Sequence, residues 1–367
     1  MPPERARAPR TRRLRIADVA VWYGERAGGI TTYLDAKAEY AGRTGAFEHH
    51  LVVPGARDAT RGSRHEVRAL RVATVNGYHI PLRTSSLSQA LLAIAPDLVL
   101  VHDRFWSLLA AGPVAADLRT PVVAVHHASA ALEAASVPGP RGAYGKVFRG
   151  WERRAYARVD AVMSATGDAQ AGDRPVLPLR FGLDPAFRPQ TRAVRGDAVV
   201  YAGRMAREKG IDSLLAAAAE SAQPWPLVLA GDGPSRGWVE GLVERLGLSE
   251  RVSFAGYVGD RSELAQTYAE ASCVVVPGAH ETFGLVALEA AASGARVVAA
   301  KPTPAASTAG PELVTTFDPG RPGDLLRAIE RARSSPPDLV AAARLAERST
   351  WDLAFEAELA DLERLIG

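Results

Sequence analysis

The chain has 367 residues, of which 47% are hydrophobic and 23% are charged, and its formal net charge is +3. This length predicts about two domains, and this composition is typical of a folded globular protein rather than a disordered chain. The sequence contains no run of eighteen or more apolar residues, so it predicts no membrane-spanning helix. The charged N-terminus is not followed by an apolar stretch, so we do not expect a secretory signal.

The charge is distributed unevenly along the chain. Residues 1–190 contain 26 Lys and Arg against 17 Asp and Glu, a net charge of +9, whereas the remaining residues contain 18 against 24, a net charge of −6. This asymmetry predicts that the first half meets an anionic partner. A disordered, solvated arm over residues 1–13 is the alternative for part of the excess, because six arginines gather in and just after it: Arg5, Arg7, Arg10, Arg12, Arg13 and Arg15.

The only cysteine of the sequence, Cys273, lies in the apolar run 271–276. One cysteine excludes an internal disulfide and a cysteine-rich metal site, and the apolar setting predicts a buried thiol. A reducing, cytoplasmic location fits this usage.

Short apolar runs alternate with helical patterns throughout. The runs predict ten buried strands, at residues 14–21, 47–53, 98–102, 122–126, 161–164, 198–201, 227–230, 252–255, 273–276 and 296–300. Helical patterns lie between them, at residues 29–40, 85–93, 144–155, 211–221, 238–246 and 283–292. The Pro- and Ala-rich stretch 301–311 predicts a loop.

This alternation predicts an α/β protein in which parallel sheets are covered on both faces by helices. Ten or more strands predict two doubly wound, Rossmann-like domains that face a cleft, with ligands at the carboxyl ends of the strands. The Gly/Pro-rich run 181–185 predicts the boundary between them. We expect an N-terminal domain over residues 1–183, a C-terminal domain over 184–348, and a helix within 349–367 that could pack back on the N-terminal domain.

Paired glycines follow the first predicted strand. Gly28 and Gly29 open the next helix, where backbone N–H groups can approach a phosphate and the helix N-terminus favours negative charge. A simple loop is the alternative for such a pair on its own. The sequence has neither a P-loop nor a full G-x-G-x-x-G fingerprint after a strand, which argues against an ATPase or a nicotinamide enzyme.

Basic residues follow the first strand predicted for the C-terminal domain. Arg204 and Lys209 are five residues apart at this strand end, where they could hold a diphosphate from two sides. Arg207 and Glu208, between them, could be only a solvated turn.

Two glutamates follow the predicted strand 273–276. Glu281 lies at the strand-to-helix turn and Glu289 lies eight residues later, which predicts that both carboxylates face the same side of one helix. The helix is otherwise apolar, so each carboxylate needs a partner, and sugar hydroxyls are suitable hydrogen-bond donors. A salt bridge inside the domain is the alternative for Glu289.

The order of these motifs resembles glycosyltransferase family 4, whose members are retaining enzymes of the GT-B fold that use nucleotide-diphosphate sugars. The resemblance extends over nearly the whole chain and rests on Gly28-Gly29-Ile30, Gly203-Arg204, Lys209-Gly210, the run Gly231–Pro234, and His280-Glu281-Thr282-Phe283-Gly284 with Glu289. Within the family, the run 277–284 and the early Tyr23-Gly24 are most similar to actinobacterial mannosyltransferases that act on phosphatidylinositol.

The resemblance implies roles for particular residues. The catalytic set that it implies is His126, Arg204, Lys209 and Glu281, with the histidine beside the transferred sugar. His127 is a rival of His126, and a core or loop role is open for either histidine. Asp103, His127 and Tyr23 are weaker candidates for contacts with the acceptor. The donor-binding set is Gly28, Gly29, Gly203, Arg204, Lys209, Tyr257, Val258, Glu281, Thr282, Phe283, Gly284, Leu285 and Glu289.

We expect a front-face substitution with retention, because the carboxylates are better placed to hold the sugar than to act as a nucleophile. Arg204 and Lys209 would stabilise charge on the leaving diphosphate. The sequence has no Asp-x-Asp motif and no His/Asp cluster, so we expect no metal and no other cofactor, and no nucleic-acid partner.

The closer resemblance implies GDP-mannose as the donor and a phosphoinositide-type glycolipid as the acceptor. A basic cluster with interleaved aromatic residues predicts peripheral contact with the inner face of the plasma membrane, although core packing would explain the aromatic residues equally well. These residues are Arg141, Lys146, Arg149, Arg153 and Arg154, with Tyr144, Phe148 and Trp151. The alternatives are a UDP-sugar or other sugar nucleotide with a soluble sugar or natural-product acceptor, a nucleotide-sugar epimerase, and a non-catalytic sugar-nucleotide-binding protein.

Overall fold

The computed structural model describes residues 12–24, 28–71, 79–81, 83–127, 141–166, 169–279, 281–301 and 303–367. The chain divides into two compact units, each with its own sheet. The first contains Met1–His127, Arg149–Arg180 and Trp351–Gly367, and the second contains Ala128–Phe148 and Phe181–Thr350. In the described part of the chain, no helix has the length and apolar character needed to cross a membrane. Of the N-terminal arm, only Arg12 and Arg13 lie within the described residues.

The sheet of the first unit is mixed. Its strand order is β3 (Ala59–Arg61), β4 (Arg64–Arg71), β2 (Glu48–Gly55), β1 (Arg15–Val19), β6 (Leu98–Val101), β7 (Val122–His126), β8 (Ala161–Ser164) and β9 (Val176–Pro178), and β5 (His79–Pro81) also pairs with β4. The strands from β4 to β9 in this order are parallel, whereas β3 and β5 pair with β4 in antiparallel fashion. The prediction of a wholly parallel sheet is therefore wrong at this edge.

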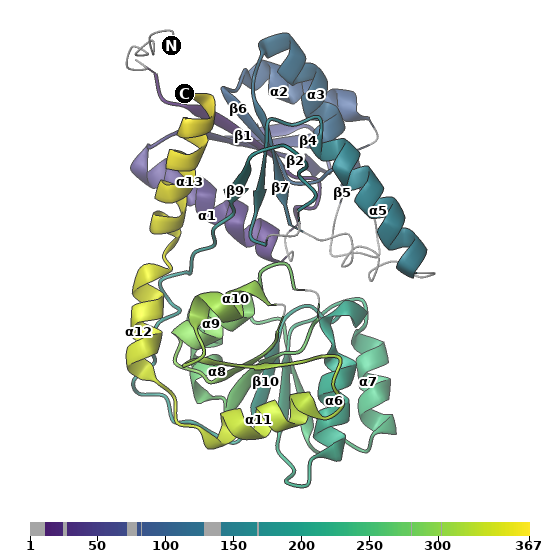
Figure 1. Cartoon of the computed structure of the whole chain (residues 1–367), viewed down its shortest axis with the longest axis vertical. Helices are drawn as coiled ribbons and strands as arrows, with labels where there is room; N and C mark the ends of the chain where they lie inside the picture. Colours follow the sequence, from purple (N-terminus) through teal and green to yellow (C-terminus); the bar gives the residue numbers. More distant parts are fainter. Residues whose placement is uncertain are drawn as a thin grey trace. The chain divides into compact units, whose positions relative to one another are not determined.

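Helices cover both faces of the first sheet (Figure 1). They are α1 (Gly29–Thr44), α2 (Thr84–Ile94), α3 (Trp106–Leu118), α5 (Arg141–Tyr156) and α13 (Trp351–Ile366). Successive strand residues point to opposite faces. Ala17 and Val19 of β1 pack into a buried apolar cluster with residues of α2, α3 and α5. The residue between them, Asp18, faces the side of α1 and α13 instead.

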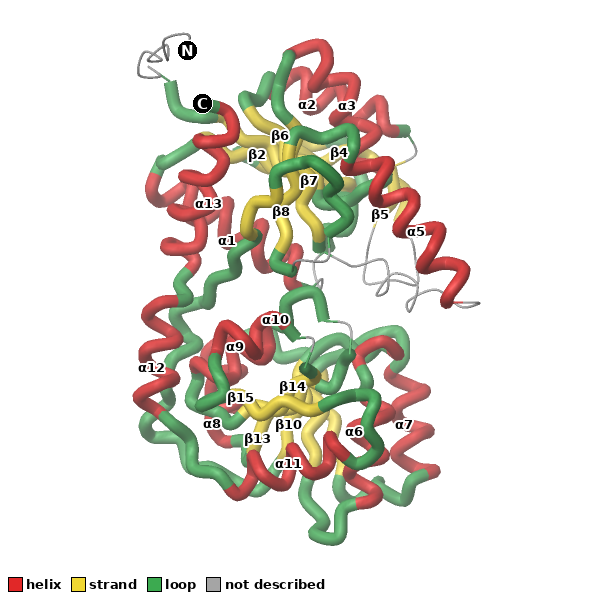
Figure 2. The backbone as a smooth tube through the Cα atoms, in the orientation of Figure 1, coloured by secondary structure: helices red, strands yellow, loops and turns green. Residues whose placement is uncertain are grey.

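The sheet of the second unit is parallel throughout, and Figure 2 shows its strands in yellow among red helices. Its order is β12 (Val252–Gly256), β11 (Leu227–Ala230), β10 (Val199–Ala202), β13 (Cys273–Val276), β14 (Val297–Ala300) and β15 (Val314–Phe317). Numbered within the unit this is the order 3-2-1-4-5-6 of a doubly wound nucleotide-binding sheet. Its helices are α6 (Ile211–Glu220), α7 (Arg236–Arg245), α8 (Arg261–Glu270), α9 (Leu285–Ala292), α10 (Pro304–Ala309), α11 (Asp324–Ser334) and α12 (Leu339–Arg348).

All ten predicted strands are present, and their bounds agree with the prediction within a few residues. Cys273 is buried, as predicted, and burial raises the pKa of its thiol to about 12. The predicted loop 301–311 is wrong, because residues 304–309 form α10. Pro304 occupies the first turn, where its missing N–H costs nothing, and three alanines, Ala305, Ala306 and Ala309, are buried.

Candidate active site

In the second sheet, β11 and β12 are added on one side of β10, whereas β13 to β15 are added on the other side. Ligands bind at this switch point, between β10 and β13, in folds of this kind. Gly203 directly follows β10, and Pro277 directly follows β13. Gly210 adopts a left-handed conformation with φ of 68°, and a Cβ atom there would lie 2.7 Å from the carbonyl oxygen of Pro277. A glycine is therefore required for the two motif-bearing loops to meet.

The structure brings two of the predicted catalytic residues together at this point. The Nζ of Lys209 lies 2.9 Å from both carboxylate oxygens of Glu281. Their side chains are 24% and 14% exposed, so the pair is largely shielded but can still be reached by a ligand. A diphosphate would compete for the ammonium group, and sugar hydroxyls would compete for the carboxylate.

Arg204 has a different carboxylate partner. Its Nη2 donates to Oε1 of Glu208, whose side chain is only 9% exposed. The interpretation of Glu208 as part of a solvated turn is therefore wrong. Arg207 is exposed and its guanidinium lies over the ring of Trp238, 4.3 Å from the centroid. Each of the two cations predicted to bind the diphosphate thus has its own carboxylate partner.

Glu281 and Glu289 do not share one helix face, contrary to the prediction. Gly284 has a φ of 86° and precedes α9, which begins at Leu285, so Glu281 lies in the loop before the helix. Glu289 lies inside α9 and is buried. Its carboxylate accepts a hydrogen bond of 3.4 Å from the Tyr268 hydroxyl and lies 3.7 Å from Nη1 of Arg261. Burial raises the pKa of Glu289 to about 7, and Arg261 opposes this shift.

The other predicted donor-binding residues follow strands of the second sheet, except for two glycines of the first unit. Phe283 stacks on Phe181, with ring centroids 4.5 Å apart, and Thr282 and Leu285 flank the turn between β13 and α9 half-buried. Tyr257 follows β12 with a 58% exposed side chain, and Val258 comes next. In the first unit, Gly28 and Gly29 begin α1, and Gly28 has open space where a Cβ would stand. His280 lies outside the described residues.

The two neighbouring histidines of the first unit face opposite sides of the sheet, as the alternation along β7 requires. His126 is buried on the side of α5, where its Nδ1 lies 2.8 Å from the Tyr156 hydroxyl and 3.3 Å from Oε1 of Glu152. Glu152 also accepts a hydrogen bond of 2.9 Å from Nη1 of Arg104. His127 is buried on the side of α1. The proximity of either histidine to a sugar stays a prediction.

The weaker acceptor candidates have contacts within the first unit. Asp103 accepts hydrogen bonds of 3.0 Å from the backbone N–H of Phe105 and 3.1 Å from that of Ser107, which orders the start of α3. The hydroxyl of Tyr23 donates to Asp35 at 2.5 Å. Burial and this carboxylate raise the pKa of Tyr23. Both residues therefore have structural roles that the motifs did not indicate.

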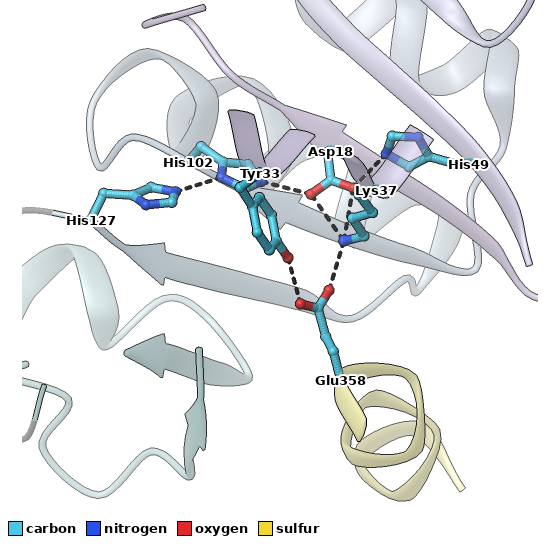
Figure 3. A network of polar contacts seen from close by, with 7 residues as sticks. All are labelled: Asp18, Tyr33, Lys37, His49, His102, His127 and Glu358. Carbon is cyan, nitrogen blue, oxygen red and sulfur yellow. Dashed lines mark hydrogen bonds and ion pairs between the residues drawn. The ribbon is translucent and has the colours of Figure 1, made fainter. Parts of the chain in front are cut away.

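A buried polar network lies on the α1 side of the first sheet (Figure 3). Lys37 of α1 sits between two carboxylates, 3.1 Å from Oδ2 of Asp18 and 2.9 Å from Oε1 of Glu358 of α13. The Tyr33 hydroxyl donates to Oε2 of Glu358 at 2.6 Å. The side chains of Lys37, Asp18 and Glu358 are at most 2% exposed. This network was not predicted, although an Asp inside an apolar strand and a Lys inside a helix are signals for it.

Asp18 and Lys37 each stabilise the charged form of the other within this network. Burial opposes ionisation of Asp18, but Lys37 and hydrogen bonds from His102 and His49 outweigh it and hold the pKa of Asp18 well below its usual value. Burial likewise disfavours the charged form of Lys37, but Asp18 and Glu358 raise its pKa overall. Both groups are therefore charged at neutral pH.

Comparisons with known proteins agree with this arrangement. The family model described as "Glycosyltransferase Family 4" matches residues 27–171, and the model described as "Glycosyl transferases group 1" matches residues 185–349. The GDP-mannose-dependent alpha-(1-6)-phosphatidylinositol dimannoside mannosyltransferase of Mycobacterium tuberculosis is 30% identical over 95% of this chain and 96% of its own. The D-inositol 3-phosphate glycosyltransferase of Mycobacterium bovis is 30% identical over 73% of this chain and 62% of its own.

Solved structures support the same fold. Sucrose-phosphate synthase from Thermosynechococcus elongatus superposes with a TM-score of 0.73 at 23% identity, over 96% of this chain and 98% of that one. Anabaena HepE in complex with UDP and glucose superposes with a TM-score of 0.70 at 18% identity, over 96% of this chain and 100% of that one. The fold and the motif positions are those of a GT-B glycosyltransferase. The chain belongs to glycosyltransferase family 4, as the motifs predict.

Proposed function

We propose that the protein transfers mannose from GDP-mannose, with retention and without a metal, to a hydroxyl group of a phosphoinositide-type glycolipid. The observation that carries this proposal is the 30% identity over nearly the full length of both chains to the mycobacterial GDP-mannose-dependent mannosyltransferase. Because this match covers nearly the whole chain, it includes both the domain expected to bind the donor and the domain expected to bind the acceptor.

The residues at the switch point of the second sheet support the donor half of the proposal. In the reaction, the acceptor oxygen bonds to the anomeric carbon on the face from which the diphosphate leaves. The bond between that carbon and the phosphate oxygen breaks, and the acceptor proton passes to the diphosphate. Lys209 and Arg204 would stabilise the developing charge of the leaving group, and Glu281 would accept hydrogen bonds from the sugar. Each cation would then exchange a carboxylate for a phosphate.

The exposed surface of α5 supports peripheral contact with an anionic membrane. Lys146, Arg149, Arg153 and Arg154 are exposed, and each could contribute about 1 kcal/mol near anionic lipid. Val147, which the sequence analysis did not single out, is 66% exposed on the same helix. Trp151 is 39% exposed and stacks on Phe105 with ring centroids 5.6 Å apart, so it is not a core residue.

Sedimentation with vesicles tests this contact. We expect binding to vesicles that contain anionic lipid, weaker binding at high salt, and little binding to neutral vesicles. The variant Lys146→Ala/Arg149→Ala should weaken it, whereas Arg188→Ala/Arg192→Ala, a matched change of two exposed arginines in the segment before β10, should not. Equal binding to anionic and neutral vesicles would remove the physical support for a lipid acceptor.

One alternative has an observation of its own. The second relative is named as a D-inositol 3-phosphate glycosyltransferase, and that name favours a soluble phosphorylated polyol as the acceptor. A matrix of donors against acceptors, read by mass spectrometry, separates the two possibilities. We expect a hexose added to phosphatidylinositol mannosides from GDP-mannose, with the anomeric configuration kept in the NMR spectrum of the product. Product only from other donors or only on soluble acceptors contradicts the proposal, and nucleotide binding without any turnover identifies a non-catalytic binder.

A further inference from the structure

Three side chains form a hydrogen-bonded chain across neighbouring strands of the first sheet (Figure 3). Oδ1 of Asp18 on β1 lies 2.6 Å from Nε2 of His102, which directly follows β6. Nδ1 of His102 lies 2.7 Å from Nε2 of His127, which directly follows β7. Because β1, β6 and β7 are adjacent and parallel, the chain runs along the carboxyl edge of the sheet, where the sheet order also reverses.

The direction of each hydrogen bond follows from the charge at one end. An ionised carboxylate can only accept, so Nε2 of His102 must carry a proton. The side chain of His102 is 1% exposed, and Lys37 already supplies a positive charge to the same carboxylate. When the ring of His102 carries a single proton, that proton is on Nε2, and Nδ1 is then an acceptor.

The direction of the hydrogen bond between His102 and His127 follows in the same way. Since Nδ1 of His102 accepts, Nε2 of His127 must donate. Burial lowers the pKa of His127 well below its usual value, so its ring is neutral and its Nδ1 carries a lone pair. Among the described residues no hydrogen bond to this Nδ1 is found.

We propose that Asp18 and His102 are positioning residues that fix the tautomer of His127, so that its Nδ1 accepts a hydrogen bond from a hydroxyl of the acceptor. His126 cannot have this role through its own Nδ1, which faces Tyr156 and Glu152 on the opposite side of the sheet. The tautomer part of the proposal depends only on the geometry of the first unit. The contact with the acceptor rests on the proposed transferase function.

The tautomer can be measured without any turnover. In a long-range ¹H–¹⁵N correlation spectrum of the full chain labelled at histidine, each ring nitrogen reports whether it is protonated. In mildly alkaline buffer we expect the His127 ring to show a protonated Nε2 and a bare Nδ1, with the signals assigned by their loss in His127→Gln. A protonated Nδ1 at His127 overturns the proposal, and this result does not depend on which donor or acceptor the enzyme uses.

The network offers a matched pair of variants. His49 lies 2.9 Å from the other carboxylate oxygen of Asp18 and is as deeply buried as His102, but it does not contact His127. His102→Phe and His49→Phe therefore each remove one imidazole from the same carboxylate, and only the first breaks the chain to His127. His102→Gln retains one donor and one acceptor and should restore the link.

We expect His102→Phe to randomise the His127 tautomer and to raise KM for the acceptor by about tenfold, the effect of one lost hydrogen bond, with donor affinity unchanged. His49→Phe should leave the tautomer as in the wild type, and His102→Gln should recover most of the loss. Equal effects of the two Phe variants would overturn the positioning role. The wild type could show the expected tautomer while a folded His102→Phe has an unchanged KM for the acceptor. That result would overturn the contact with the acceptor but not the tautomer assignment. If His102→Phe does not fold, the wild-type spectrum and the His102→Gln variant still test the proposal.

Discussion

Replacement of Lys37 by methionine should destabilise the first unit strongly. The change keeps the length of the side chain but removes the lysine charge that lies between the Asp18 and Glu358 carboxylates, at 3.1 and 2.9 Å. Both carboxylates are at least 98% buried, so solvent cannot replace the lost partner. Removal of one member of such a buried group costs about 3–5 kcal/mol. For a domain of this size the unfolding midpoint should fall by roughly 10 °C.

Urea and thermal unfolding, followed by circular dichroism, measure this loss of stability. Lys146→Met, on the exposed face of α5, is the control, because it removes a lysine without breaking a buried ion pair. The difference between wild type and Lys37→Met should shrink at acid pH. The Asp18 pKa is depressed in the folded wild type, so its stabilising contribution is present above the unfolded pKa and is lost as the pH falls through the folded pKa. A loss of stability at neutral pH below about 1 kcal/mol, the level of an exposed pair, would show that the Lys37 charge does not stabilise this buried group.

Four further outcomes are expected. Arg204→Ala should lower kcat by roughly a hundredfold or more, with a smaller loss of donor affinity, while Arg207→Ala should stay within a few-fold; similar kcat values for the two would contradict the diphosphate assignment. Glu281→Gln should cripple transfer but leave the affinity for the bare nucleoside diphosphate nearly intact by calorimetry, and an equal loss of both would mean a structural role. Activity should persist in excess chelator, and a complete, Mg²⁺-reversible loss would show that a metal is needed. Because the folded pKa of Glu289 is raised from 4.5 to about 7, wild-type stability should fall as the pH rises between these values, and Glu289→Gln should flatten this fall; parallel stability profiles would argue against the raised pKa.

The buried parts of the fold could be predicted from the sequence because central parallel strands are continuous apolar runs. Val122–His126 and Cys273–Val276 have the predicted bounds for this reason. The strands that were missed lie at or next to the sheet edges or are very short. β4 contains four charged residues in eight, and β15 has only four residues with two threonines, so neither resembles a buried run.

The residues of the site could be predicted from the sequence, but the contacts between them could not. Motif order placed Lys209 and Glu281 at the ends of β10 and β13, yet only the approach of the two loops at Gly210 shows that they form an ion pair. Helical spacing failed for Glu281 and Glu289 because a glycine in a left-handed conformation begins the helix later than the apolar pattern suggests. The network around Asp18 joins residues from β1, α1, β2, α13 and the segment after β6, and spacing along the chain carries no information about such contacts.

The contact between Lys37 and Glu358 also has a consequence for the order of folding. α13 follows the whole second unit in the chain, yet it supplies one of the two carboxylates that hold Lys37. More than three hundred residues separate Lys37 from Glu358 in the sequence, so during synthesis the second of its two carboxylates is supplied only when α13 has been made. Until then, the surface of α1 that Tyr33 and Tyr40 present to Phe355 stays uncovered. The nascent first unit therefore exposes aromatic surface that the completed chain covers.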